Sequence, residues 1–285
     1  MRCVRSLRKR ATRFFLKRLI EDVRNDKLRP FRIDEGGLWF ETRYGFSVHS
    51  NLRDRILDLD KKAIWEEMES TFVVNNLKPG DVFVDVGANI GYFSMLAALQ
   101  KAGKVFAIEP IPKTYAMLNM NIDHNRFTSV IEPVNIALGS QEHTARFTCS
   151  LGPKNHVEYD VDDIHHDVPT IDVKVTTLDH LLADRKEIKG VDFVKVDIEG
   201  AEYSFLLGAE KTIKAFKPII MMEIEEHRLT KYHVTAEDIF TFMNDLGYRY
   251  LAVAEDSITK GDIPAEDLKR GRDFIFYSSN HNLTY

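Results

Sequence analysis

The stretch VFVDVGANIGYFS, residues 82–94, places two glycines, an Asp and an Asn between an apolar strand pattern and the start of a helix. Gly87 and Gly91 permit a tight turn and leave the backbone open to a close neighbour. The helix that follows offers N–H groups at its N-terminus, which favour polar or anionic ligand groups. Open α/β sheets bind ligands at such turns, beyond the carboxyl ends of their strands. The stretch therefore predicts a nucleotide-like ligand.

The spacing of this turn excludes the commonest nucleotide fingerprints. A dinucleotide motif reads G-x-G-x-x-G, whereas Asn89 stands between glycines spaced G-x-x-x-G, and a phosphate-binding G-x-x-x-x-G-K-S/T is absent. Asp85 would repel a pyrophosphate but suits a ligand with an amino group, such as S-adenosylmethionine. Glu109, about twenty residues after the turn, stands where an acid usually binds ribose hydroxyls. S-adenosylmethionine is the predicted ligand, and a turn without any ligand is the alternative.

Short apolar runs alternate with helical patterns from residue 81 onward. The apolar runs cover residues 81–86, 104–108, 130–138, 191–198, 218–224, 248–253 and 272–278. The helical patterns cover residues 91–102, 112–124, 178–186, 201–215 and 235–246. This alternation predicts an α/β protein of three layers, with a mostly parallel sheet covered by helices on both faces.

The rest of the chain is organised around that domain. We expect a basic helical segment at 1–35, a lead-in with a hairpin and a helix at 36–78, and the cofactor-binding domain at 79–285. An insertion at about 143–177 interrupts the alternation and predicts a hairpin with a long tip. Long loops over such sheets are often binding loops.

Charge is distributed unevenly along the 285 residues, whose net charge is −5. Residues 1–32 carry twelve Lys or Arg against three acids, so this segment is +9 and the remainder is −14. Its amphipathic pattern predicts either a helix packed on the catalytic domain or peripheral contact with an anionic membrane. The overall charge gives no reason to expect a nucleic-acid partner. Two distant cysteines and no long apolar run predict a cytoplasmic protein without disulfides.

Several motifs resemble the FkbM-type family of S-adenosylmethionine-dependent methyltransferases. They are VFVDVGANIGYFS, AIEP, VDFVKVDIEGAEYSFLLGAE (191–210) and KPIIMMEIEE (217–226), with DIEGAE (197–202) the most specific. The resemblance covers residues 68–250 and implies a Rossmann-like, seven-stranded methyltransferase fold with an antiparallel last strand. It also implies O-methylation of hydroxyls on sugars, glycolipids or natural products. The cofactor-binding residues that it implies are Asp85, Gly87, Asn89, Gly91, Glu109, Asn135, Ala137 and Asp197.

Methyl transfer to oxygen requires positioning of the hydroxyl and removal of its proton. Asp197 is the first candidate for the base, and Glu199, Glu223 and His227 are the further candidates. No metal ligand is predicted, although Asp197, Glu199 and Glu223 provide the oxygen ligands that Mg²⁺ prefers, and Mg²⁺ stays an alternative. Glu202 either faces the site or only caps the next helix.

The sequence therefore predicts an S-adenosylmethionine-dependent O-methyltransferase that acts on a hydroxyl of a sugar or glycoconjugate. Two alternatives stay open. One is a methyltransferase for a polyketide, lipid or peptide hydroxyl, and the other is a non-catalytic cofactor-binding module associated with a membrane.

Overall fold

The computed structural model describes residues 31–34, 37–50, 64–148, 169–254, 257–260 and 272–285. The chain divides into two compact units, Met1–Trp65 and Glu66–Tyr285. Almost all of the expected basic helical segment lies outside the described residues, as does the tip of the expected insertion at 149–168.

The first unit contains a three-stranded antiparallel sheet. Its strands are β1 (Phe31–Asp34), β2 (Gly37–Glu41) and β3 (Ser47–Ser50), paired in that order. Thr42 closes the turn between β2 and β3, because its backbone N–H and its hydroxyl both donate to the carbonyl of Phe46.

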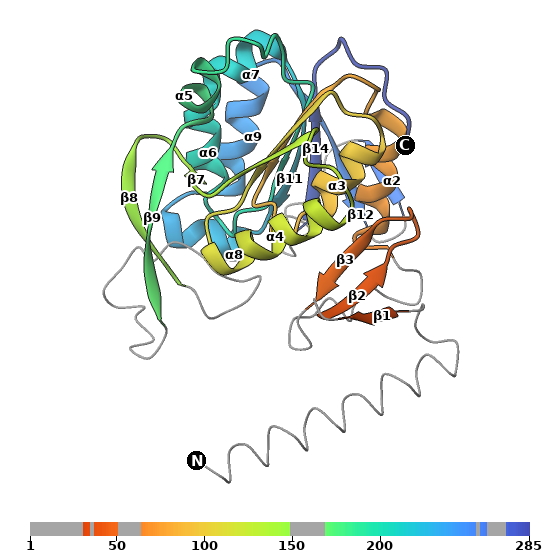
Figure 1. Ribbon diagram of the computed structural model, residues 1–285. Helices are drawn as coiled ribbons and strands as arrows, with labels where there is room; N and C mark the ends of the chain where they lie inside the picture. Colours follow the sequence, from red (N-terminus) through yellow and green to blue (C-terminus); the bar gives the residue numbers. More distant parts are fainter. Residues whose placement is uncertain (1–30, 35–36, 51–63, 149–168, 255–256, 261–271) are drawn as a thin grey trace. The chain divides into compact units, whose positions relative to one another are not determined.

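The second unit is built on an eight-stranded sheet (Figure 1). In spatial order its strands are β13 (Ser257–Lys260), β12 (Arg249–Ala254), β14 (Arg272–Tyr277), β11 (Ile219–Ile224), β10 (Phe193–Val196), β4 (Val82–Val86), β5 (Lys104–Ile108) and β6 (Ile131–Val134). The chain enters at β4, adds β5 and β6 on one side and then crosses to β10 and β11 on the other. The topological switch point, where such sheets bind ligands, therefore lies between β4 and β10.

The predicted fold class is confirmed, with one strand more than expected. Strands β4, β5, β6, β10 and β11 pair in parallel, and the last strand, β14, is antiparallel to both of its neighbours. The additional strand is β13, which pairs with β12 at the edge. Most of its side chains are exposed, so it lacks the apolar alternation by which a strand is predicted.

Helices cover both faces of the sheet (Figure 1), which gives the predicted three layers. One face carries α2 (Glu67–Asn76), α3 (Tyr92–Leu99) and α4 (Pro112–His124). The other carries α5 (Leu178–Ala183), α6 (Glu202–Gly208), α7 (Glu210–Phe216) and α9 (Ala236–Asp245). The short helices α8 (Glu226–Leu229) and η4 (Thr230–Tyr232) follow β11. The helices that the structure describes are all too short or too polar to cross a lipid bilayer.

Two predicted elements are divided in the structure. The apolar run at 130–138 forms β6 and then β7 (Ala137–Leu138), which leaves the main sheet and joins β8 (His143–Thr148) and β9 (Thr170–Thr176) in a smaller sheet. The helical pattern at 201–215 forms α6 and α7 with a break at Ala209. A Cβ at Gly208 would lie 1.9 Å from the carbonyl oxygen of Gly139, so the end of α6 packs directly on backbone.

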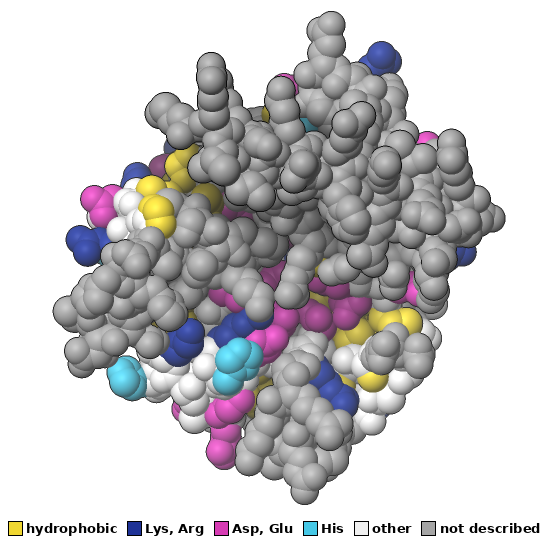
Figure 2. Space-filling view, turned by 90° about the horizontal axis from the view of Figure 1, so that it is seen from below, with side chains coloured by type: hydrophobic (Ala, Val, Ile, Leu, Met, Phe, Trp, Pro, Cys, Tyr) yellow, Lys and Arg dark blue, Asp and Glu magenta, His cyan; other side chains and the backbone are white. Residues whose placement is uncertain are grey.

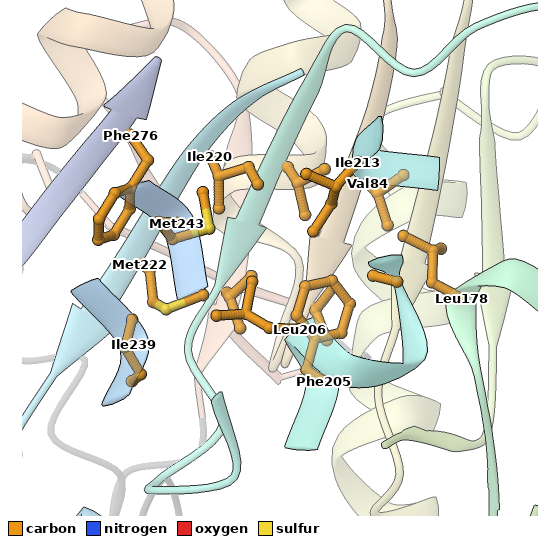
Figure 3. Packing of buried hydrophobic residues seen from close by; sticks show 14 of the residues in the cluster. Val84, Leu178, Phe205, Leu206, Ile213, Ile220, Met222, Ile239, Met243 and Phe276 are labelled. Atoms are coloured by element: carbon orange, nitrogen blue, oxygen red, sulfur yellow. The ribbon is translucent and has the colours of Figure 1, made fainter. Parts of the chain in front are cut away.

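Buried apolar side chains join the sheet to the layer of α5, α6, α7 and α9 (Figure 3). Val84 of β4 and Ile220 and Met222 of β11 face Phe205 and Leu206 of α6, and none of the five is more than 1% exposed. Each such side chain contributes about 1.5–3 kcal/mol on burial. This core fixes the strands whose carboxyl ends carry the candidate site.

Candidate active site

The glycine turn after β4 is held by protein neighbours. Gly87 has a φ of +81°, its N–H donates to the carbonyl of Ile108, and a Cβ there would lie 2.0 Å from the backbone oxygen of Asp197. Gly91 has a φ of +90°, and a Cβ there would lie 2.4 Å from Leu118 Cδ1. The positive φ angle favours glycine at both positions, and at Gly87 the backbone of Asp197 also excludes a Cβ. Gly87 thereby allows the ends of β4 and β10 to meet.

Glu109 connects this turn to the end of β5. Its Oε2 accepts the N–H of Asn89 at 3.0 Å, and its Oε1 accepts the N–H of Ile111 at 2.9 Å. Asn89 has a φ of +51°, a conformation that Asn tolerates better than most residues. Burial raises the pKa of Glu109 to about 7, against the opposing effect of these two hydrogen bonds. The predicted ribose-binding acid thus already fixes two backbone segments.

Asn135 and Ala137, two of the residues that the resemblance implies for cofactor binding, are in different surroundings. Asn135 is exposed and donates from Nδ2 to the carbonyls of Glu109 and Pro110, at 2.8 and 3.0 Å. Ala137 lies on β7 and is buried in a small apolar cluster with side chains of β8 and β9. Asn135 therefore belongs to the edge around Glu109, whereas Ala137 supports the smaller sheet.

Asp85 lies beneath the surface of the site. It is 2% exposed, and its Oδ2 accepts the hydroxyl of Ser94 at 2.6 Å. The register of β4 and β10 places Lys195 beside it. Lys195 is 4% exposed, with its Nζ 3.2 Å from Asp197 Oδ2 and 4.8 Å from the ring centroid of Phe93. Burial raises the pKa of Asp85, and the charge of Lys195 opposes that shift.

Asp197 and Glu223 form a coupled pair of carboxyl groups at the ends of β10 and β11. Burial disfavours ionisation of Asp197, but the charge of Lys195 and hydrogen bonds from Lys195 and Glu223 lower its pKa overall. Burial and the charge of Asp197 raise the pKa of Glu223 to about 9. Lys195 thus favours the ionised form of Asp197, and the charge of Asp197 favours the protonated form of Glu223.

Arg228 on α8 binds three glutamates. Its Nη1 lies 2.5 Å from Glu199 Oε2 and 2.9 Å from Glu223 Oε2, and its Nε contacts Glu225 Oε2. Burial raises the pKa of Glu199 to about 7, and the charges of Asp197 and Glu225 add to that rise while Arg228 opposes it. The guanidinium thus draws the acids that follow β10 and β11 into one cluster.

Glu202 fixes the turn after β10. Its Oε1 accepts the N–H groups of Ile198 and Gly200, at 3.2 and 3.1 Å, and its side chain is buried. A Cβ at Gly200 would lie 2.7 Å from Tyr232 Cε2, so the turn also packs closely on η4. In this structure Glu202 holds the backbone of the turn that precedes α6, and α6 has no side-chain cap.

His227 lies on the exposed side of α8. Its side chain is 69% exposed, and its Nε2 is 3.4 Å from Glu225 Oε2. Among the described residues, the imidazole ring of His227 contacts Glu225 and not Asp197. Of the four candidate bases, Asp197, Glu199 and Glu223 share one network, and His227 lies at its margin.

The three carboxylates considered as alternative Mg²⁺ ligands form ion pairs with basic side chains of the protein. Asp197 binds Lys195, and Glu199 and Glu223 bind Arg228. Across the described ranges, no group of three or more His, Cys, Asp or Glu side chains is arranged to hold a metal ion.

Acidic side chains gather on the face of the molecule where β11 ends and α8 begins. Figure 2 shows them as a band across the middle of the view from below, with Lys, Arg and His side chains beside it. The two cations that organise this edge, Lys195 and Arg228, were not among the residues predicted from the sequence. Lys195 gave a usable signal, because a lysine inside the apolar run VDFVKVDI is rarely buried without an acidic partner.

Comparison with known proteins agrees with this geometry. The family model described as "Methyltransferase FkbM domain" matches residues 85–250, which is more than half of the chain. This protein belongs to the FkbM methyltransferase family. The matched residues include the glycine turn, Glu109 and the cluster around Arg228.

Two curated relatives illustrate the range of the family. The 31-O-demethyl-FK506 methyltransferase FkbM of Streptomyces tacrolimicus is 29% identical over 162 residues, covering 47% of this chain and 61% of the relative. The hexuronic acid methyltransferase AglP of Haloferax volcanii is 29% identical over 144 residues, covering 50% of this chain and 55% of the relative. The chain thus spans less than two thirds of either relative.

Among solved structures, the methyltransferase FkbM of Methylobacillus flagellatus has a TM-score of 0.43 and 20% sequence identity to this chain. The match covers 70% of this chain and 44% of that one.

Proposed function

We propose that this protein transfers the methyl group of S-adenosylmethionine to a hydroxyl group of a sugar or glycoconjugate. The observation that carries the proposal is the meeting of the glycine turn and Asp197 at the switch point between β4 and β10. A cofactor held at that turn lies beside a carboxylate that can accept a proton. Membership of the family supports this chemistry.

The residues around the turn suit this cofactor. Each oxygen of Glu109 accepts one backbone N–H, and a carboxylate oxygen has room for a second donor, so Glu109 can also bind ribose hydroxyls. Asn135 lies on the same edge and keeps its amide oxygen as an acceptor. Backbone of the turn at 87–91 would contact the methionine part. When bound, the cofactor supplies a sulfonium-activated methyl group and a neutral thioether leaving group.

Asp197 is the proton acceptor in this proposal. Its side chain is 32% exposed, and it stays ionised because Lys195 and Glu223 stabilise its charge. Asp197 would accept the proton of the hydroxyl group whose oxygen receives the methyl group that a bound cofactor would supply. Arg228 holds Glu199 and Glu223 at the same edge, where they shape the acceptor side.

A non-sugar acceptor is the second candidate, and one relative's name favours it. The Streptomyces relative is named for a methyl group on O-31 of FK506 and not for a sugar. The Haloferax relative is named for a hexuronic acid and favours the sugar. The two candidates share the cofactor, the base and the reaction and differ only in the acceptor.

A labelled transfer assay tests the proposal. The full chain is incubated with methyl-labelled S-adenosylmethionine and a panel of glycans, glycolipids and polyketide alcohols, and products are identified by mass spectrometry. Wild type is expected to label a hydroxyl. Asp197→Asn should reduce turnover by about 10²–10⁴.

Asp192→Asn is the matched control, because Asp192 precedes β10 and lies at the opposite end of that strand from Asp197. Its turnover should match wild type. Transfer to nitrogen or carbon only, no transfer to any acceptor, or full activity of Asp197→Asn would contradict the proposal.

A further inference from the structure

We propose that Lys195 is a positioning residue that pairs with Asp197 from beneath the site and takes the place of a cofactor amine as the charge partner of Asp85. The inference rests on the proposed function, in which Asp197 accepts the hydroxyl proton. It assigns Asp85 a role behind the site instead of direct contact with the cofactor.

Lys195 is buried between the carboxylate of Asp197 and the ring of Phe93. A lysine that is 4% exposed needs compensation for its lost hydration. Its Nζ is 3.2 Å from Asp197 Oδ2 and lies over the ring of Phe93 at 4.8 Å. Ring and carboxylate together fix the ammonium group, and the ammonium group in turn restricts the carboxylate of Asp197.

Asp85 is enclosed by protein on the strand next to Lys195. Asp85 is 2% exposed, bonded to Ser94, and beside Lys195 in the register of β4 and β10. A carboxylate enclosed in this way has little surface to offer an amino group of a ligand. Asp85 therefore acts through Lys195, whose charge it balances.

The surrounding charges make Lys195 the central cation of this region. Acidic groups face it from every side of the sheet edge: Asp85 from β4, Asp197 after β10, Glu223 from β11, Asp273 from β14, and Glu66 and Glu69 at the start of α2. Burial alone would lower the pKa of Lys195, but these acids raise it, so the lysine stays protonated. Asp197 also interacts electrostatically with four other side chains: Arg228, Glu109, Glu199 and Glu202.

Removing the lysine charge should have two separable effects. Lys195→Met leaves Asp85 buried without its cation, which destabilises the fold. The double variant Asp85→Asn/Lys195→Met removes the lysine charge together with the carboxylate beside it, while the amide oxygen of Asn can still accept the hydroxyl of Ser94. In this double variant Asp197 lacks its cation in a folded protein.

The experiment compares Asp85→Asn with the double variant in the full chain. Selective ¹³Cγ-aspartate labelling follows the titration of Asp197 by NMR, with Asp197→Asn used to assign the resonance. The Asp197 midpoint is expected to stay low in Asp85→Asn and to rise by at least about one pH unit in the double variant, which corresponds to tenfold or more in proton affinity. The acidic limb of the kcat profile should rise with it.

Two further readouts separate positioning from a merely structural role. S-adenosylhomocysteine affinity should change less than about threefold in Asp85→Asn, because Asp85 does not touch the cofactor. Lys195→Arg should keep the low Asp197 midpoint, since it keeps the charge. An unchanged midpoint in the double variant, or a loss of S-adenosylhomocysteine binding in Asp85→Asn, would overturn the inference. Absence of methyl transfer by wild type would instead contradict the proposed function, and the NMR midpoints would still decide the pairing of Lys195 with Asp197.

Discussion

The turn after β4 and the turn after β10 lie at the same edge of the sheet and are stabilised differently. Each depends on a buried glutamate that accepts two backbone N–H groups. Glu109 uses both carboxylate oxygens, one for each donor. Glu202 accepts both donors with Oε1. A substitution that removes one carboxylate oxygen should therefore cost more at Glu109 than at Glu202.

The two turns also differ in their charges. The hydrogen bonds that the structure gives to the Glu109 carboxylate come from backbone N–H groups. After β10, Asp197 is bound by Lys195 and Glu199 by Arg228. The first turn thus presents fixed backbone, which suits the recognition of a cofactor. The second concentrates side-chain charge, which suits proton transfer.

The largest expected effect is on the contact that joins the two turns. Gly87→Ala would bring a Cβ to 2.0 Å from the Asp197 backbone oxygen at a φ of +81°. The clash and the strain together should lower the free energy of unfolding by about 3 kcal/mol, measured by urea denaturation. Gly80→Ala is the control, because its φ is +94° with nothing within 4 Å, and it should cost only about 1 kcal/mol. Equal losses would show that the contact contributes nothing.

Replacing one oxygen distinguishes the two glutamates. In Glu109→Gln the amide NH₂ must face either Asn89 or Ile111, both of which donate, so a buried N–H loses its acceptor. We expect a loss of about 2 kcal/mol. Glu202→Gln keeps one oxygen for both donors and should lose less than about 0.5 kcal/mol. Both are measured by denaturation at pH 5.5, below the raised pKa of about 7 of each glutamate. Equal losses would contradict the assignment of the oxygens.

Arg228→Gln tests the charge cluster after β10. Three glutamates lose their common cation, and at pH 8 the free energy of unfolding should fall by about 1 kcal/mol, a modest value because these side chains are partly exposed. At pH 5 the loss should be smaller, since Glu199, with a pKa of about 7, is ionised at pH 8 and protonated at pH 5. A loss that is independent of pH would contradict this account.

The smallest expected effect is a change in the pH dependence of stability. The pKa of Glu202 rises from 4.5 to about 7 on folding, mainly through burial. Its protonated form therefore stabilises the fold below pH 4.5, and that contribution is lost as the pH rises through about 7. Glu202→Gln cannot ionise, so its stability relative to wild type should increase by about 1 kcal/mol between pH 6 and pH 7. A parallel pair of stability curves would contradict the raised pKa.

The fold was largely predictable because its central strands are buried and apolar. The run at 81–86 became β4 (Val82–Val86), and the run at 104–108 became β5 without change. The exposed edge strand β13 was missed because two-sided exposure removes the periodic signal. The division of 130–138 into β6 and β7 depends on pairing with β9, a contact between segments that are distant in the sequence.

The acidic residues of the site could be predicted from the sequence more readily than its basic residues. Acids placed directly after strands, such as Glu109 and Asp197, follow from local pattern and known sheet geometry. The roles of Lys195 and Arg228 depend on which acids surround them, and that follows from strand register and the placement of α8. The enclosed state of Asp85 likewise depends on α3, which provides Ser94.

In the proposed function, S-adenosylmethionine binds at the turn after β4 with Glu109 on its ribose. Calorimetric titration of S-adenosylhomocysteine and NAD into wild type, Glu109→Gln and Glu132→Gln tests it most directly. Glu132 is the control because it lies on β6 and binds Lys104 and Arg185. Wild type and Glu132→Gln should bind S-adenosylhomocysteine alike and more tightly than NAD, and Glu109→Gln should bind at least about tenfold more weakly. Tighter binding of NAD by wild type, or undiminished binding by Glu109→Gln, would contradict the account.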